Sequence, residues 1–129
     1  MICTDSCNFN DILNIDPKFT RCVIDTEGDK AWFLNGKYHR EEGPAVECAD
    51  GDKSWFLNGK LHRTDGPACE YADGAKFWYL NGLRHRTDGP AVEWANGDKS
   101  WYLNGKELTE EEYIIKMRIN KLESFFVPN

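Results

Sequence analysis

Three histidines stand out among the side chains of this 129-residue chain that could carry chemistry. His39, His62 and His85 follow one another at intervals of 23 residues, and imidazoles are common zinc ligands. Equivalent positions in successive hairpins would lie two strand spacings apart, about 10 Å, whereas zinc ligands lie ~2.1 Å from the ion. We therefore expect no metal site. The spacing predicts instead a repeated structural hydrogen bond that braces the segment after each Asn-Gly.

An arginine follows each histidine, at Arg40, Arg63 and Arg86. Guanidinium groups bind carboxylates through paired hydrogen bonds, and Glu42, Asp65 and Asp88 lie two residues further along. We expect a ladder of arginine–carboxylate bonds between adjacent loops. The functional alternative is a comb of arginines that grips the carboxylate or phosphate of a ligand.

A longer sequence pattern contains these residues. Trp-Phe/Tyr-Leu-Asn-Gly occurs at 32–36, 55–59, 78–82 and 101–105, always with the same period of 23 residues. Half of a degenerate unit, Cys22 to Lys30, precedes the first full one. Fixed periods of this length indicate a repeat array, and such arrays bind or scaffold far more often than they catalyse.

Turn signals divide each unit into short strands. Asn-Gly, Asp/Asn-Gly and Gly-Pro recur in that order along the chain, and the runs between them alternate between apolar and polar residues. We read each unit as a two-stranded hairpin, Ala-x-Glu-x-Ala and then Lys-x-Trp-aromatic-Leu, followed by a longer return segment. The predicted fold is mainly β: an elongated antiparallel β-hairpin repeat sheet over residues 20–107.

Two aromatic columns follow from the alternation within the strands. The first column should form the spine of the sheet because identical side chains stack in register: Trp32, Trp55, Trp78 and Trp101. The second lies on the opposite face and should form an exposed stripe, the best candidate for a binding surface: Phe33, Phe56, Tyr79 and Tyr102. The alternative is a rolled sheet that buries both columns.

Glu47, Glu70 and Glu93 make a third column. They are expected on the solvated face, where they could also present a negative strip to a basic partner. A less favoured role is mimicry of a phosphate backbone.

The C-terminal segment departs from the repeat. Residues 108–129 are predicted to form a capping helix and tail, with Thr109 and Glu112 as a capping box. Tyr113, Ile114, Met117 and Ile119 recur at roughly helical spacing, so the helix should cover the open end of the sheet. Binding a partner is the second interpretation of this helix. Residues 1–19 are assigned as the opposite, N-terminal cap.

Composition restricts the classes of partner. The net charge of −6 opposes direct binding to nucleic-acid phosphates or to anionic lipid, because both need a basic face. No apolar run is long enough to span a membrane. Five irregularly placed cysteines without an export signal predict reduced thiols and a cytoplasmic location.

Residues 58–74, which include Asn-Gly-Lys, His-Arg-Thr-Asp-Gly-Pro and Tyr-Ala-Asp-Gly, resemble a MORN repeat. The resemblance is to the variant found in uncharacterised proteins of large DNA viruses and some bacteria, and it covers roughly residues 20–105. The sequence departs from the family in its return segment and in having Trp-aromatic-Leu in place of Tyr-x-Gly. The resemblance implies a hairpin-repeat fold and a role in protein contact or membrane-associated scaffolding.

The expected function is a non-enzymatic protein-interaction or scaffold module, a viral or bacterial factor that binds a host or partner protein. It should need no cofactor, because no nucleotide-binding or nucleophile motif occurs. Two alternatives remain open: an acidic inhibitor that mimics nucleic acid, and a membrane-associated scaffold of the MORN type.

Overall fold

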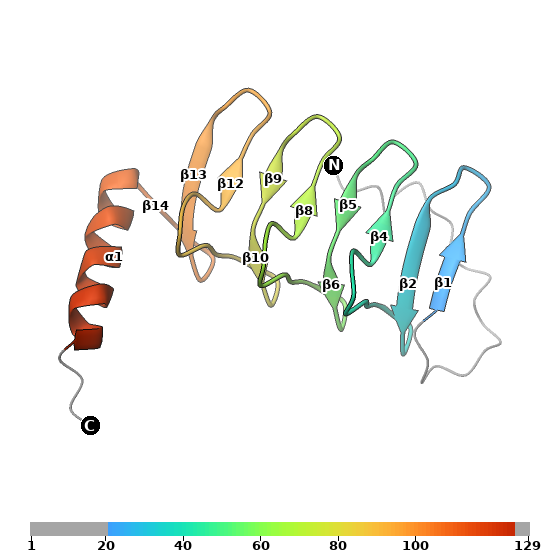
Figure 1. Cartoon of the computed structure of the whole chain (residues 1–129), viewed down its shortest axis with the longest axis horizontal. Helices are drawn as coiled ribbons and strands as arrows, with labels where there is room; N and C mark the ends of the chain where they lie inside the picture. Colours follow the sequence, from blue (N-terminus) through green and yellow to red (C-terminus); the bar gives the residue numbers. More distant parts are fainter. Residues whose placement is uncertain (1–20, 126–129) are drawn as a thin grey trace.

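Hairpins lie side by side in a row, and a helix stands at the C-terminal end of that row (Figure 1). The structure, a computed structural model, describes residues 21–125. The expected fold class, an antiparallel β-hairpin sheet with a C-terminal capping helix, is confirmed. The proposed N-terminal cap, residues 1–19, lies outside the described residues.

The strands are short and repeat in a fixed order along the chain. The first half contains β1 (Arg21–Ile24), β2 (Lys30–Leu34), β3 (Lys37–Tyr38), β4 (Val46–Glu47), β5 (Lys53–Ser54), β6 (Phe56–Leu57) and β7 (Lys60–Leu61). The second half contains β8 (Cys69–Glu70), β9 (Lys76–Phe77), β10 (Tyr79–Leu80), β11 (Leu83–Arg84), β12 (Val92–Glu93), β13 (Lys99–Leu103) and β14 (Lys106–Leu108).

The main sheet runs in the order β1-β2-β4-β5-β8-β9-β12-β13-β14, with every pairing antiparallel. The predicted hairpins are β4 with β5, β8 with β9, and β12 with β13. A second, smaller hairpin follows in each unit, formed by β2 with β3, β6 with β7, β10 with β11 and β13 with β14. Each unit therefore turns twice, at opposite edges of the array.

The Asn-Gly turns form the lower edge of the array in Figure 1. Asn58 has a φ of 51° and Gly59 a φ of 80°, and the other three turns are alike. Positive φ at both central residues is the geometry that joins two adjacent strands with the correct twist. Asparagine is one of the few residues with a side chain that adopts it readily.

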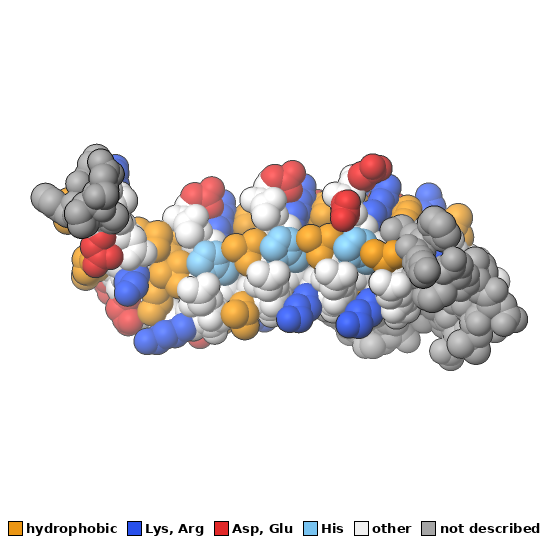
Figure 2. All heavy atoms as spheres, turned by 90° about the horizontal axis from the view of Figure 1, so that it is seen from below, with side chains coloured by type: hydrophobic (Ala, Val, Ile, Leu, Met, Phe, Trp, Pro, Cys, Tyr) orange, Lys and Arg blue, Asp and Glu red, His pale blue; other side chains and the backbone are white. Residues whose placement is uncertain are grey.

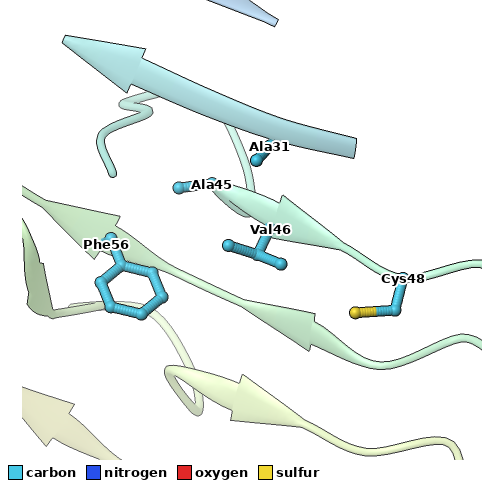
Figure 3. Packing of buried hydrophobic residues seen from close by; sticks show 5 residues of the cluster. All are labelled: Ala31, Ala45, Val46, Cys48 and Phe56. Atoms are coloured by element: carbon cyan, nitrogen blue, oxygen red, sulfur yellow. The ribbon is translucent and has the colours of Figure 1, made fainter. Parts of the chain in front are cut away.

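Small residues and a few aromatics form the hydrophobic core of the sheet. Ala31, Ala45, Val46, Cys48 and Phe56 make one buried cluster, and Figure 3 shows their side chains gathered on neighbouring strands. The second cluster lies one unit further along and contains Cys69, Ala75, Phe77 and Val92. Because Val46, Cys69 and Val92 occupy the same position in successive units, the core is repeated as regularly as the turns.

The helix α1 (Glu110–Phe125) begins where the fourth return segment would start. Thr109 occupies the position of Arg40, Arg63 and Arg86, and its hydroxyl accepts the backbone N–H of Glu112 at 3.1 Å. This is the N-terminal bond of the predicted capping box. Buried Tyr113 holds the helix to the array, since its hydroxyl donates to the carbonyl of Arg86 at 2.7 Å.

Candidate interaction surfaces

An arginine covers each of the first three tryptophans. The guanidinium carbon lies 3.8 Å from the ring centroid for Arg40 over Trp32, 3.9 Å for Arg63 over Trp55, and 3.8 Å for Arg86 over Trp78. This distance is well within cation–π range. The tryptophans are half-buried and lie outside both hydrophobic clusters, so the expected tryptophan spine is instead a row of aromatic rings under guanidinium groups.

The same arginines hold their own return segments in place. Arg63 donates from Nε to Asp65 at 2.9 Å, and from Nη1 to the Pro67 carbonyl and to Glu70, both at 3.0 Å. Arg86 makes the same three contacts one unit later. These bonds join each arginine to its own return segment and to the strand that follows it, β8 or β12, and not to an adjacent loop. This corrects the expected ladder between loops. The hydrogen bond from Arg63 also lowers the pKa of the Asp65 carboxyl.

The glutamate column is paired on the same face of the sheet. Glu47, Glu70 and Glu93 lie 3.6, 3.0 and 3.2 Å from the guanidinium nitrogens of Arg40, Arg63 and Arg86. A lysine also stands in register on each side of every glutamate, from Lys30 to Lys99. Opposite charges across neighbouring strands attract, so the column is part of an alternating row and not an isolated negative strip.

The Phe/Tyr column lies on the core side of the sheet. Phe56 is buried within the first cluster, Phe33 packs against that cluster, and Tyr79 and Tyr102 pack against the second. The expectation of an exposed aromatic stripe is therefore wrong. Alternation along the strand correctly separates this column from the tryptophans, but it does not say which of the two faces the core.

A charged side chain distinguishes the later part of this aromatic column from the earlier part. Arg84 donates to the hydroxyls of Tyr79 at 3.1 Å and Tyr102 at 3.2 Å. The bond to Tyr79 is the main reason that the pKa of Arg84 is raised. In the two earlier units the position of Arg84 is held by Tyr38 and Leu61, beside Phe33 and Phe56, which have no hydroxyl.

The histidines form a row on the underside of the array, which is the face that Figure 2 shows. Nδ1 of His39, His62 and His85 accepts the backbone N–H of Asn58, Asn81 and Asn104, at 3.0, 3.0 and 2.9 Å. Each bond thus reaches the Asn-Gly turn of the following unit, whereas the sequence suggested only a brace within one return segment. An imidazole whose Nδ1 accepts in this way carries its proton on Nε2.

A matching bond at the opposite edge was not foreseen from the sequence. A carboxylate oxygen of Asp29 accepts the backbone N–H of Ala49 at 2.7 Å, and Asp52 accepts that of Ala72 at 2.8 Å. The signal was present, because Asp29 and Asp52 are one period apart. In the next unit Ala75 takes the place of the aspartate, so the ladder of carboxylates ends there.

Three carboxylates come together in the first hairpin turn. The ligand atoms of Asp25, Glu27 and Asp29 lie within 4.8 Å of one another. Oδ1 of Asp25 accepts the backbone N–H groups of Glu27 and Asp29, at 2.9 and 3.0 Å. The cluster is thus explained by the geometry of the turn.

Open grooves separate successive return segments. One of about 570 Å³ lies between Arg40–Pro44 and Arg63–Asp65, and its floor contains Trp55 and Leu57. Another of about 540 Å³ occupies the equivalent place one unit later, over Trp78 and Leu80. The two grooves are lined by the same types of residue. Neither groove therefore contains a set of polar groups that is absent from the other.

Cysteine chemistry differs from what the sequence suggested. Cys22 and Cys69 are free thiols, but Cys48 is disulfide-bonded, which corrects the expectation that all thiols are reduced. Burial raises the pKa of Cys69, whose thiol is almost fully enclosed. Cys69 is therefore a core side chain and not a reactive nucleophile.

The helix α1 presents an apolar face to solvent. Ile114, Ile115, Ile119 and Leu122 are between 41% and 58% exposed. At about 100° per residue, Ile115 and Leu122 lie within ~20° of directly opposite Tyr113, which is bonded to the array. We call these four residues the outer face of α1. The sequence placed apolar residues on this helix but did not separate a docked side from an outer one.

Comparisons with protein-family models, curated proteins and solved structures found no match for this chain. The resemblance to MORN repeats therefore stays a prediction from the motif. No helix within residues 21–125 is both long enough and apolar enough to cross a membrane.

Proposed function

We propose that this protein is a non-enzymatic protein-interaction module in which the repeat array is a stiff support and α1 makes the contact. The observation that carries the proposal is the outer face of α1, where four large aliphatic side chains meet solvent on the side away from the array. An apolar helix face of this kind docks into a complementary protein surface through residues about one turn apart.

The repeats themselves favour a supporting role. Their histidines and arginines are engaged in bonds that hold turns and return segments, and these bonds are copied from unit to unit. Catalysis needs a few groups brought together at one place, and periodic bonding does not favour this. The paired glutamates likewise do not favour mimicry of nucleic acid, since each has a cation within 3.6 Å.

The charges of α1 favour a protein partner over a lipid surface. The helix carries four acidic and three basic side chains, and its first turn is Glu110-Glu111-Glu112. Helices that lie on anionic membranes are instead rich in lysine and arginine.

A cytoplasmic location is part of the proposal. The free thiols of Cys22 and Cys69 support it, and the disulfide of Cys48 opposes it.

The test compares the native chain with an Ile115→Lys variant in affinity capture from a lysate that also contains a differently tagged copy of the native chain, followed by mass spectrometry. Leu83→Lys is the matched control, because Leu83 is an equally exposed aliphatic residue and the other three units carry lysine there. The native chain and the control should retain a protein that Ile115→Lys loses. Equal capture by all three chains would overturn the role of α1.

Membrane contact is tested separately by flotation with vesicles of phosphatidylcholine and phosphatidylserine. We expect the protein to stay at the bottom of the gradient. If the native chain floats and Ile115→Lys does not, the outer face of α1 binds lipid. That result would overturn the proposed protein partner and favour a membrane-associated scaffold.

A further inference from the structure

We propose that the outer face of α1 binds a second copy of this chain, with the two helices antiparallel. This inference rests on the proposed function, since it names the partner for the same face. It would join two arrays through their helix-capped ends into one longer assembly related by a two-fold axis.

The position of the face permits this arrangement. Tyr113 ties one side of α1 to the array through Arg86 and Gly89, and the outer face lies on the other side. Figure 1 shows α1 at the extreme end of the row of hairpins, so nothing of the described chain stands beyond it. A second helix can approach there without meeting the strands of the first copy.

The charged residues of α1 are complementary to those of a second α1 that runs in the opposite direction. Glu111 and Arg118 are seven residues apart, about two helical turns, and therefore lie on the same side of α1 as the outer face. Glu110 and Lys121 lie on the flank next to them. Within this set of four residues, both glutamates precede both cations along the helix. A parallel pair would set these like charges together, whereas an antiparallel pair sets Glu111 against Arg118 and Glu110 near Lys121 of the other copy.

The pairing has a definite centre. A two-fold axis beside Ile114 and Ile115 places Glu111 of each copy opposite Arg118 of the other, because both lie about three and a half residues from that axis. Ile114 and Ile115 of both copies then pack at the middle, where water is excluded. The two ion pairs are equivalent by symmetry, so every change in Glu111 or Arg118 acts twice.

The interface would be small, which sets the strength to expect. Sixteen residues make a helix about 24 Å long, and a single helix pair buries less than the ~1,600 Å² of a standard interface. We expect a reversible dimer and not a permanent one. It should become detectable at protein concentrations of roughly tens to hundreds of micromolar.

The test is sedimentation equilibrium of the full chain together with charge-reversed variants. The native protein should shift towards twice the 14.9 kDa mass of one chain as concentration rises. Glu111→Arg alone and Arg118→Glu alone should each weaken association about tenfold, because each variant places like charges together twice. An equimolar mixture of the two variants should recover it, since all pairs across the mixed dimer are again opposite.

Controls separate this geometry from general effects of charge. Lys116→Glu reverses a charge on the flank away from Glu111 and Arg118, and Leu83→Lys removes an exposed aliphatic side chain from the array. Both should associate like the native chain. Circular dichroism and thermal melts should show that each variant stays folded, because all of the changed side chains are exposed or half-exposed.

Three outcomes would overturn the inference: a native chain that stays monomeric at several hundred micromolar, variants that associate as well as the native chain, or a mixture that fails to recover association. A monomer that still loses its captured protein through Ile115→Lys would leave the proposed function standing with another partner. A monomer whose capture is insensitive to Ile115→Lys would remove both.

Discussion

Trp55 and Phe56 are neighbours in the chain and lie on opposite faces of the sheet, and their surroundings differ in kind. Phe56 is 8% exposed and belongs to a cluster of alanine, valine and cysteine side chains. Trp55 is half-buried beneath the guanidinium group of Arg63, which in turn is bonded to Asp65 and Glu70. Two aromatic columns with one period are therefore stabilised in two ways, one by exclusion of water and one by a polar cover.

An aromatic residue that recurs in a repeat is therefore not necessarily part of the hydrophobic core. A large ring can be covered by aliphatic neighbours or by the planar group of an arginine, which packs on it while keeping its hydrogen bonds at the edge. On the hydrophobic face, stability should fall when a side chain loses volume. On the polar face, it should depend on the planar, forked arrangement of the arginine N–H donors.

The largest effect is expected for Phe56→Ala. It empties a position in the first core cluster, and removal of a buried phenylalanine ring costs about 3–5 kcal/mol of unfolding free energy. Urea unfolding followed by far-ultraviolet circular dichroism measures it. Lys60→Ala, at an exposed position four residues later, is the control and should change little. A loss below about 1 kcal/mol would contradict the assignment of this face as the core.

Arg63→Lys tests the polar cover of Trp55. Lysine keeps the charge but loses the planar stack and the arrangement of bonds to Asp65, Pro67 and Glu70, so we expect a loss of about 1–2 kcal/mol. The same unfolding measurement applies, with Lys53→Arg as the reverse exchange at an exposed strand position. If Arg63→Lys leaves the unfolding free energy unchanged, Arg63 contributes over Trp55 no more than a surface ion pair would.

Tyr113→Phe examines the point at which α1 meets the polar return segment of the third unit. It removes the bonds to the Arg86 carbonyl and from the Gly89 N–H and should cost about 1 kcal/mol at neutral pH.

The contribution of Tyr113 should also depend on pH. Burial raises the pKa of Tyr113 above its ordinary value of about 10. Its stabilising contribution is therefore complete below that value and is lost as pH rises through the higher pKa of the folded protein. The difference in unfolding free energy between the native chain and Tyr113→Phe should shrink as pH rises above about 10. A constant difference would mean that the pKa of Tyr113 is the same in the folded and in the unfolded protein.

His62→Ala isolates one bond between neighbouring units. The backbone N–H of Asn81 loses its acceptor, and we expect a cost of about 1 kcal/mol. Hydrogen exchange of the Asn81 amide is the direct measurement, and it should speed up in the variant while the amides of the first unit keep their protection. Unchanged exchange at Asn81 would contradict the bond.

The smallest effect is expected for Leu83→Lys. Leu83 is half exposed, and Lys37, Lys60 and Lys106 hold its position in the other units. Thermal unfolding should change by less than about 0.5 kcal/mol in free energy. A larger loss would show that the contact of Leu83 with Gly105 contributes to the stack.

Much of the architecture follows from the printed sequence. Asn-Gly and Asp-Gly specify the turns because few other residues adopt positive φ easily, and the period aligns each turn with the next. The capping box at Thr109 is equally local. The aspartate ladder from Asp29 to Ala49 was readable in principle, although a carboxylate in a turn has many possible partners and spacing does not choose among them.

The sequence by itself determined the repeat, the main hairpin of each unit, the turns, the helix and the separation of the two aromatic columns, but not the second, smaller hairpin at each Asn-Gly. Only the tertiary structure decided which column faces the core. Alternation places neighbouring side chains on opposite sides of a strand but is symmetrical between those sides. The choice depends on what the return segment brings back to the sheet. It brings Arg63 over Trp55, whereas the small residues Ala45, Val46 and Cys48 lie near Phe56. The outer face of α1 was undecided for the same reason, because the docked side is defined by Arg86 and Gly89, about one repeat away in the chain.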